Sequence, residues 1–460
     1  MDNKENKEKE FNRQVAKKLQ VERWMKQVTQ QTLAERMETT KSAISRLEKG
    51  EQNISMETAA KYAYALGMEP AFQLQVQESI GLYHAGTDYC LRLFDDDLIR
   101  FSMKDELGLQ VHILWIDEEK KHLMPAGMEL TDEGLAKWLK RRTIPKNRAY
   151  VEQILGAYDL TVNDTKEILD LCKGLSLNDS YWVVPEGFAQ TFDECNLYDH
   201  DFMEILSVIA YTGAPYSLKK ITTSPEFTTN GMLRKAWRNK GEKGIWLYKG
   251  GTEDFANAGN EPFSEVMAYQ IAKKMGLNAV PYELENWKGI LTSKCKLFTN
   301  RYFSYVPAGW VVREGGLPAC LAYYRELGPG FADQLCSMLV FDALIYNEDR
   351  HYGNFGLLRD NRTGKFVAPA PVFDNGISLF CYGMKKDFDT LEDYAATRTP
   401  PYGGTFEDVC KLAMGPLQKE QLRRMINFRF DDLEPVSLPR WRIEAIEEQL
   451  QRRVQQMLEM

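Results

Sequence analysis

The chain has 460 residues, of which 44% are hydrophobic and 27% are charged, a composition typical of folded globular domains and not of disordered chains. That length exceeds one ordinary core, so two to four domains are expected. Eight cysteines without a CxxC pair and only five histidines argue against a zinc site or a disulfide framework. The charged start MDNKENKEKEF lacks the apolar segment of a signal peptide, and no run of 18 or more apolar residues predicts a membrane span. We therefore expect a cytoplasmic protein.

Charge is distributed unevenly along the chain. The formal net charge is −8, yet residues 1–78 carry 13 basic and 12 acidic side chains, so the acidic excess lies beyond them. Affinity for DNA depends on neutralising phosphates. Any DNA contact is therefore expected on the N-terminal segment, in two copies supplied by a homodimer.

Residues 11–78 are expected to form an all-α domain. Helical spacing of apolar residues predicts a first helix over 12–25 and a last one over 54–68. Between them, Thr29 is a candidate N-cap for TQQTLAERM, and KSAISRLEKG places Ile44 and Leu47 inward, with Gly50 as the stop signal. Two short helices joined by the break ETT predict a helix-turn-helix.

The run TQQTLAERMETTKSAISRLEKG resembles the Cro/C1 type of repressor domain, through Thr29-Gln30, Leu33-Ala34, Ile44-Ser45-Arg46 and Glu48-x-Gly50. The resemblance implies operator binding. The residues expected to face base edges are Lys41, Ser42, Ser45 and Arg46, and Gln30 is expected to meet a phosphate. Two alternatives stay open: these side chains form an ordinary solvated helix face, or the fold contacts only protein.

Residues 80–214 are expected to form an accessory α+β domain. LGLQVHILWI predicts a strand, and LTDEGLAKWLKRR and RAYVEQILGAY predict helices. VNDTKEILDLCKGLSLNDSYWVV predicts a helix followed by a loop. The histidines here are isolated, and no spacing indicates a metal or nucleophile site. We assign this region no chemistry.

The pattern changes in residues 215–460. GEKGIWLYKGG predicts a strand that turns Lys249 toward the buried side, which is costly unless an anion meets the amine. A strand lysine that holds ATP phosphates is one recurring solution, and a solvent-reaching surface lysine is the alternative. The helix NEPFSEVMAYQIAKKMGL offers Glu261 and Glu265 as partners, of which Glu265 is preferred because it lies inside the helix.

The loop in LIYNEDRHYGNFGLL places Asp349 five residues before Asn354. Phosphoryl transfer needs a carboxylate to orient the acceptor hydroxyl and oxygens to hold Mg²⁺, and protein kinases use this spacing for those two roles. After a predicted hairpin, APVFDNGISLF supplies a second acid, Asp374, in a sharp turn. Together with Lys249, these residues predict a site for ATP and Mg²⁺.

The Asp-Arg-His-x-x-Asn order, between a lysine strand and an Asp turn, resembles the HipA family of bacterial serine/threonine kinases over residues 215–460, and is shared by phosphatidylinositol kinases. The resemblance implies Asp349 as catalytic base, Asn354 and Asp374 as Mg²⁺ ligands, Lys249 on the phosphates and His351 beside the nucleotide. HipA kinases are usually paired with a separate Cro-like partner, HipB. One chain carrying both modules suggests a toxin–antitoxin-like or autoregulated transcriptional regulator.

No GxGxxG loop precedes Lys249; the sequence offers KKITTSPEFTTNGMLRKAW instead. We expect residues 219–235 to form a flexible loop over the phosphates, with an ordinary polar loop as the alternative. Its candidate autophosphorylation sites are Thr222, Thr223, Ser224, Thr228 and Thr229.

The expected architecture is a helix-turn-helix domain, an accessory region and a two-lobed α+β kinase-like domain. The expected activity is phosphoryl transfer from ATP to a protein Ser or Thr. A nucleotide-sensing regulator without phosphotransfer and a small-molecule or lipid kinase are the alternatives, and the lack of a basic membrane-facing segment weakens the lipid version.

Overall fold

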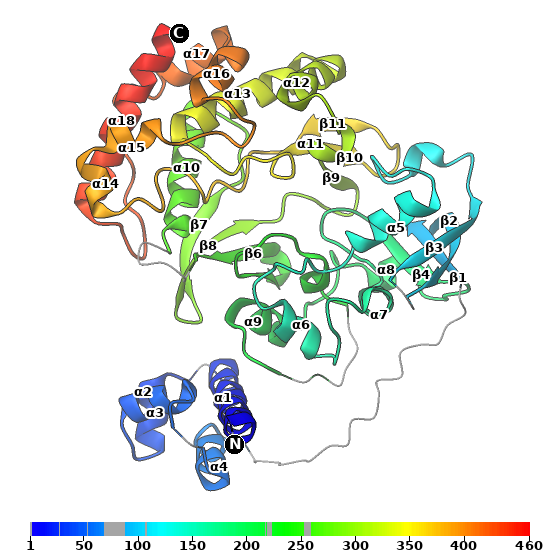
Figure 1. Ribbon diagram of the computed structural model, residues 1–460, viewed down its shortest axis with the longest axis vertical. Helices are drawn as coiled ribbons and strands as arrows, with labels where there is room; N and C mark the ends of the chain where they lie inside the picture. The colour runs from blue at the N-terminus through cyan, green and yellow to red at the C-terminus, as the bar shows by residue number, and fades with distance from the viewer. Residues whose placement is uncertain are drawn as a thin grey trace.

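The computed structural model describes residues 2–26, 28–52, 54–68, 88–105, 108–216, 218, 223–252 and 259–460. It contains a group of N-terminal helices, three antiparallel sheets and a C-terminal helical region (Figure 1). None of the helices in these ranges is both long and apolar enough to cross a membrane. The expected class, a helical domain followed by a mixed body with a two-lobed α+β part, is confirmed.

Four helices build the N-terminal domain: α1 (Asp2–Met25), α2 (Gln30–Arg36), α3 (Lys41–Glu48) and α4 (Met56–Ala65). The hydroxyl of Thr29 accepts a hydrogen bond from the backbone N–H of Thr32 at 3.1 Å, so the predicted cap of α2 is confirmed. Ile44 and Leu47 are 1% and 2% exposed, as the spacing predicted. Gly50 follows α3 with φ +69°, the left-handed conformation that ends helices.

The accessory region contains a four-stranded sheet in the order β3-β2-β1-β4. The expected strand is present as β3 and the expected helices as α5 to α7, whereas β1, β2 and β4 were not predicted. The elements of this region are β1 (Asp88–Leu93), β2 (Asp96–Lys104), β3 (Gln110–Ile116), η1 (Lys121–Leu123), α5 (Asp132–Lys140), α6 (Val151–Gly156), α7 (Thr165–Cys172), β4 (Tyr181–Pro185), α8 (Phe192–Cys195) and α9 (Glu204–Thr212).

The small lobe of the kinase-like part is a sheet in the order β5-β6-β8-β7, with one long helix packed on β7 and β8. Its strands run antiparallel, and Lys235 on β5 lies opposite Lys249 on β6. The elements are η2 (Pro225–Thr228), β5 (Lys235–Asn239), η3 (Gly241–Lys243), β6 (Ile245–Gly250), α10 (Glu261–Met275), β7 (Tyr282–Trp287) and β8 (Ile290–Lys296).

The large lobe is mainly helical and forms the largest hydrophobic core, centred on α13 (Pro329–Ile345). The predicted stripe of α13 is buried: Leu335, Met338, Leu339 and Leu344. Its other elements are β9 (Phe303–Pro307), α11 (Ala308–Val311), α12 (Gly316–Leu327), β10 (Gly356–Asp360), β11 (Phe366–Pro369), α14 (Lys385–Asp389), α15 (Leu391–Ala396), α16 (Phe406–Ala413), α17 (Pro416–Arg423) and α18 (Arg440–Glu459).

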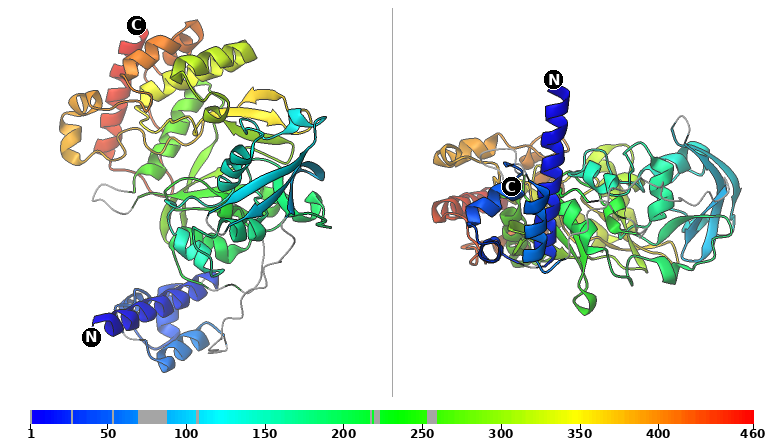
Figure 2. Two further views of the ribbon diagram at one scale, coloured as in Figure 1. Left: turned by 45° about the vertical axis from the view of Figure 1, so that its right-hand side comes forward. Right: turned by 90° about the horizontal axis from the view of Figure 1, so that it is seen from below.

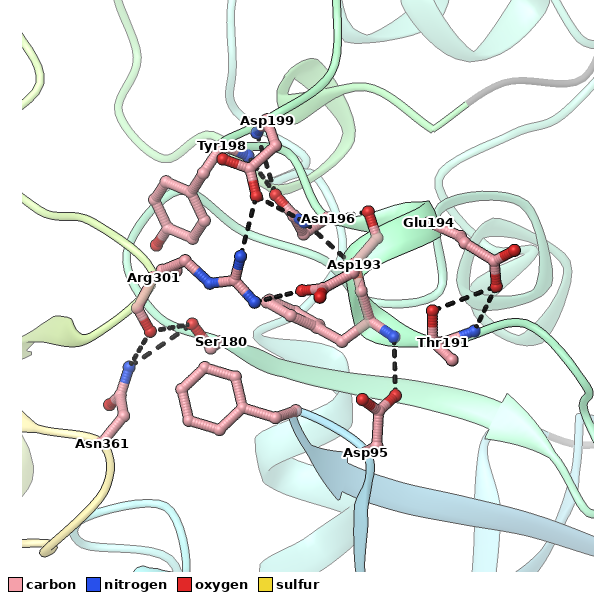
Figure 3. A network of polar contacts seen from close by, with 12 residues as sticks. Asp95, Ser180, Thr191, Asp193, Glu194, Asn196, Tyr198, Asp199, Arg301 and Asn361 are labelled. Atoms are coloured by element: carbon pink, nitrogen blue, oxygen red, sulfur yellow. Dashed lines mark hydrogen bonds and ion pairs between the residues drawn. The ribbon is translucent and has the colours of Figure 1, made fainter.

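Polar contacts join the accessory region to the kinase-like part. The guanidinium of Arg301 donates to Asp199 at 3.1 Å and also to Asp193, both from the accessory region (Figure 3). Its backbone carbonyl accepts from Ser180 at 2.6 Å and from Asn361 at 2.9 Å. The loop between β8 and β9 is therefore held from both sides.

Helix α1 connects the helix-turn-helix to the rest of the molecule (Figure 2). Val21 is fully buried against Val208 and Ala214, next to the C-terminal half of α9. The hydroxyl of Tyr216 donates to Glu22 at 3.3 Å. The N-terminal domain thus docks through α1, and the outer face of α3 remains exposed at Lys41, Ser42 and Arg46.

Candidate nucleotide and phosphotransfer site

The candidate site starts from Lys249 at the end of β6. Its amine donates to Glu265 on α10 and, at 2.5 Å, to Asp374. The side chains of Lys249 and Glu265 are 8% and 1% exposed, whereas that of Asp374 is 34% exposed. Lys249 therefore lies inward, as expected, and Glu265 is its helix partner; Glu261 instead accepts from Thr252 and Tyr382.

The turn around Asp374 is fixed by its neighbours. Asp374 has φ +57°, an uncommon left-handed conformation for a residue with a side chain. Its N–H donates to the hydroxyl of Tyr282 at 3.2 Å, and the N–H of Asn375 donates to Glu265 at 2.7 Å. Glu265 therefore contacts both the amine of Lys249 and the turn at Asp374. Through this side chain, α10 of the small lobe is joined to the acidic turn.

The loop after α13 carries Asp349, His351 and Asn354. The side-chain amide of Asn354 donates to the backbone carbonyl of Asp349 at 2.9 Å, and the N–H of Asp349 donates to Asn347 at 3.0 Å. His351 is exposed, and its Nδ1 accepts from the N–H of Gly353. The loop therefore orders Asp349 and Asn354 together, with His351 on the solvent side.

Arg350, for which no role was predicted from the sequence, makes most of the contacts that hold this loop in place. It is fully buried and pairs with Asp342 on α13 at 2.9 Å. It also donates to the carbonyl of Asn354 at 2.9 Å, to the carbonyl of Phe373 and to the side chain of Asn375. One side chain thereby joins the loop to the acidic turn. An acid inside the apolar helix FADQLCSMLVFDALI was the sequence signal for it, because such a group requires a partner.

The pKa values of the two acids are shifted in opposite directions. Burial and the negative charge of Asp374 raise the pKa of Asp349. Burial opposes ionisation of Asp374 too, but the ammonium groups of Lys249 and Lys235 outweigh it and lower the pKa of Asp374. The sensitivity of Asp349 to the charges of Asp374 and Lys249 indicates that the loop and the turn share one site. A carboxylate with raised pKa suits proton acceptance, and one with lowered pKa suits cation binding.

Lys235 is a second cation of this site. It is 8% exposed and faces the same side of the sheet as Lys249, its cross-strand partner. Burial, reinforced by Lys249, lowers the pKa of Lys235 to about 8. In the sequence, Lys235 is the last residue of the segment 219–235, and no role was predicted for it.

The donor set fits Mg²⁺ bound together with phosphates. Mg²⁺ prefers oxygen ligands and usually takes one or two carboxylates plus substrate phosphates. Asp374 and Asn354 supply a carboxylate and an amide oxygen, with Asp349 nearby. Across the described ranges, no group of three or more His, Cys, Asp or Glu forms an all-protein metal cage.

Residues 223–235, the described part of the predicted loop over 219–235, differ from the expected flexible loop. Ser224, the N-cap of the short helix η2, and Thr228, its last residue, are 1% and 4% exposed. Thr228 donates to the carbonyl of Leu175 at 2.8 Å, and the Ser224 hydroxyl accepts from the N–H of Glu226. Thr223 and Thr229 are half-buried, and Thr222 lies outside the described residues. The segment docks because Glu226 is buried against Arg148.

The candidate DNA-contacting residues lie on α2 and α3. Lys41, Ser42 and Arg46 are exposed on α3, and Ser45 is half-buried. Gln30 differs from expectation because its amide donates to Glu48 at 2.8 Å. Glu48 is itself buried and paired with Arg23, so Gln30 belongs partly to an internal network.

Comparison with known proteins supports the N-terminal domain directly. Residues 22–73 match the helix-turn-helix family HTH_3. A search of curated proteins finds no match.

Two solved structures are similar to the chain. The proinflammatory kinase CtkA of Helicobacter pylori is 17% identical with a TM-score of 0.38, over 49% of this chain and 93% of CtkA. A chain of the toxin–antitoxin complex of HipA, HipB and operator DNA from Shewanella oneidensis MR-1 is 11% identical with a TM-score of 0.48, over 81% of this chain and 99% of that chain.

Proposed function

We propose that this protein is a HipA-like serine/threonine protein kinase that depends on ATP and Mg²⁺, fused to a DNA-binding domain. The observation that carries the proposal is the ion triad that the buried Lys249 and Glu265 form with the half-buried Asp374, beside the loop of Asp349 and Asn354. A buried amine held between two acids fits a phosphate site, since each acid orients the amine. The protein would act in the cytoplasm.

Each residue has a defined role in this proposal. Mg²⁺ held by Asp374 and Asn354 would offset charge on the phosphates. Lys249 and Lys235 bind phosphate oxygens, and Glu265 keeps Lys249 in place. Asp349 orients the acceptor hydroxyl and takes its proton, to which its raised pKa is suited. Arg350 positions the loop against the acidic turn, and His351 lies at the solvent edge.

DNA binding is the second part of the proposal. The matched helix-turn-helix and the exposed Lys41, Ser42 and Arg46 support contact with an operator. Ser45 and Gln30 are half-buried and would contribute less to this contact. A homodimer would place two such domains on one duplex. Operator contact and kinase activity on one chain fit an autoregulated, toxin–antitoxin-like regulator.

The test is transfer of label from γ-labelled ATP with Mg²⁺, to the protein itself and to a generic protein acceptor. Wild type is expected to incorporate label, Asp349→Asn and Asp374→Asn to lose it by at least about a hundredfold, and the exposed Asp389→Asn to match wild type. Equal labelling of all four proteins would refute the site. Nucleotide binding without transfer by wild type would favour a nucleotide-sensing regulator.

A further inference from the structure

A cavity lies where the helix-turn-helix meets the kinase-like small lobe. Its volume is about 530 Å³, and it opens to solvent. The ends of α1, α2 and α3 form one wall, and the tip of the β7–β8 hairpin, Lys288 and Gly289, forms the other. In Figure 1 this hairpin points toward α2 and α3.

The lining of the cavity is cationic and polar. Arg23, Lys41 and Lys288 contribute positive charges, and no acidic residue lines it. Arg23 is already paired with Glu48, but no hydrogen bond or ion pair to the described residues engages Lys41 or Lys288. Burial lowers the pKa of Lys288; Glu204 opposes this shift, whereas Arg238 and Arg23 reinforce it. An anion in the cavity would stabilise the ammonium of Lys288.

The hairpin tip is an unusual place for lysine. Lys288 and Gly289 have φ +55° and +79°, the pattern of a two-residue turn in which both residues are left-handed. Asn-Gly is the favoured pair there, since the left-handed conformation costs most residues with a Cβ about 1–2 kcal/mol and Asn tolerates it better. The sequence therefore places a cation where the backbone favours Asn.

The cavity adjoins the DNA-facing side of the domain without covering it. Lys41 lines the cavity and begins α3, while Ser42 and Arg46 on the same helix remain exposed. A duplex seated on α3 would carry its backbone past Lys41 toward Lys288. An open cavity of this size is large enough for phosphates of that backbone.

We propose that this cavity receives the phosphate backbone of a DNA duplex, so that Lys288 on the kinase-like lobe contacts DNA beside the helix-turn-helix. The inference rests on the proposed DNA binding and extends it to a second domain. The proposed contact of Lys288 is independent of base sequence, since it is made to phosphates.

The test measures binding of a fluorescent mixed-sequence duplex of about 30 base pairs, long enough for two half-sites, from about 50 to 200 mM salt. Lys288→Asn removes the charge and suits the turn, so it preserves the fold. We expect it to weaken binding and to make the slope of log affinity against log salt shallower by about 0.9 per contact. Lys288→Arg keeps the charge and should leave both the affinity and the salt slope as in wild type. Lys365→Asn, in the turn of another hairpin, should change neither quantity.

The outcomes distinguish the Lys288 contact from the proposed DNA binding. Unchanged or tighter binding by Lys288→Asn overturns the inference, and tighter binding would mean that the hairpin obstructs DNA. If Lys41→Ala weakens binding in the same series, the proposed DNA binding still stands. Failure of wild type to bind the duplex at the lowest salt overturns both.

Discussion

Lys235 and Lys249 occupy paired positions on neighbouring strands, yet their settings differ. Lys249 has two acids in contact, which outweigh the cost of burial and raise its pKa above the ordinary lysine value. Lys235 forms no ion pair with an acid among the described residues, and burial lowers its pKa to about 8 although the charge of Asp374 opposes the shift. Between pH 7 and 9, therefore, Lys235 loses its charge while Lys249 keeps its own.

This difference predicts a pH-dependent affinity for nucleotide. If the protonated Lys235 binds phosphate, affinity for ATP should be nearly constant below about pH 7, fall by about twofold at pH 8 and by about tenfold at pH 9. Lys235→Arg keeps its charge and should remove the fall, whereas Lys235→Met should bind weakly at every pH. Calorimetric titration of Mg·ATP across this range is the measurement. Parallel curves for wild type and Lys235→Arg would contradict the assignment.

Sequence spacing pointed to ionisable residues that the structure brings close together, but it missed Arg350, which contacts both segments. Asp349 and Asn354 are five residues apart in one loop, and Asp374 follows a short hairpin, so local geometry brings them near each other. Arg350 acts through partners in three separate segments. No spacing within the loop reveals such contacts, because they depend on how α13 and the acidic turn pack.

The segment around η2 is an element held by one buried pair. The side chains of Glu226 and Arg148 are both fully buried, and Glu226 also accepts from the N–H of Trp237 at 2.7 Å. Removing one member of such a pair leaves an uncompensated charge and costs about 3–5 kcal/mol. Release of the segment would relieve that cost and expose Ser224 and Thr228.

Glu226→Gln is therefore expected to increase hydrogen exchange in residues 223–230 without unfolding β5 and β6. Exchange followed by mass spectrometry measures this directly. Glu242→Gln, on the exposed turn η3, is the matched control and should leave the segment protected. Equal protection in both variants would show that Glu226 does not hold the segment. Increased self-labelling of Glu226→Gln with ATP would further support phosphorylation there.

Elements with local signals were predicted well, and those without them were not. Caps and helical spacing located α2 and α3 within about a residue, since these signals lie inside the element. Strands β1 and β4 are buried along most of their length, so they lack the alternation by which a strand is recognised. The docking of η2 depends on Arg148, which lies far away in the sequence.

For the molecule as a whole, the orientation of the helix-turn-helix depends on α1. This helix contributes to two interfaces: Leu19 packs on the N-terminal core, and Val21 packs on Val208 and Ala214. Sequence periodicity identified the helix but not its two partners, because both faces show apolar spacing. The interface with the body can therefore be changed without removing a residue of the domain's own core.

Val21→Asp should separate the domain from the body, since a buried carboxylate without a partner is costly there. We expect a larger radius of gyration in X-ray scattering and unchanged helical circular dichroism, with the exposed Lys18→Asp behaving as wild type. If Lys288 contacts DNA only in the docked arrangement, Val21→Asp should reduce the salt slope as Lys288→Asn does, and the double variant should reduce it no further. Additive losses would mean that docking and the Lys288 contact are independent.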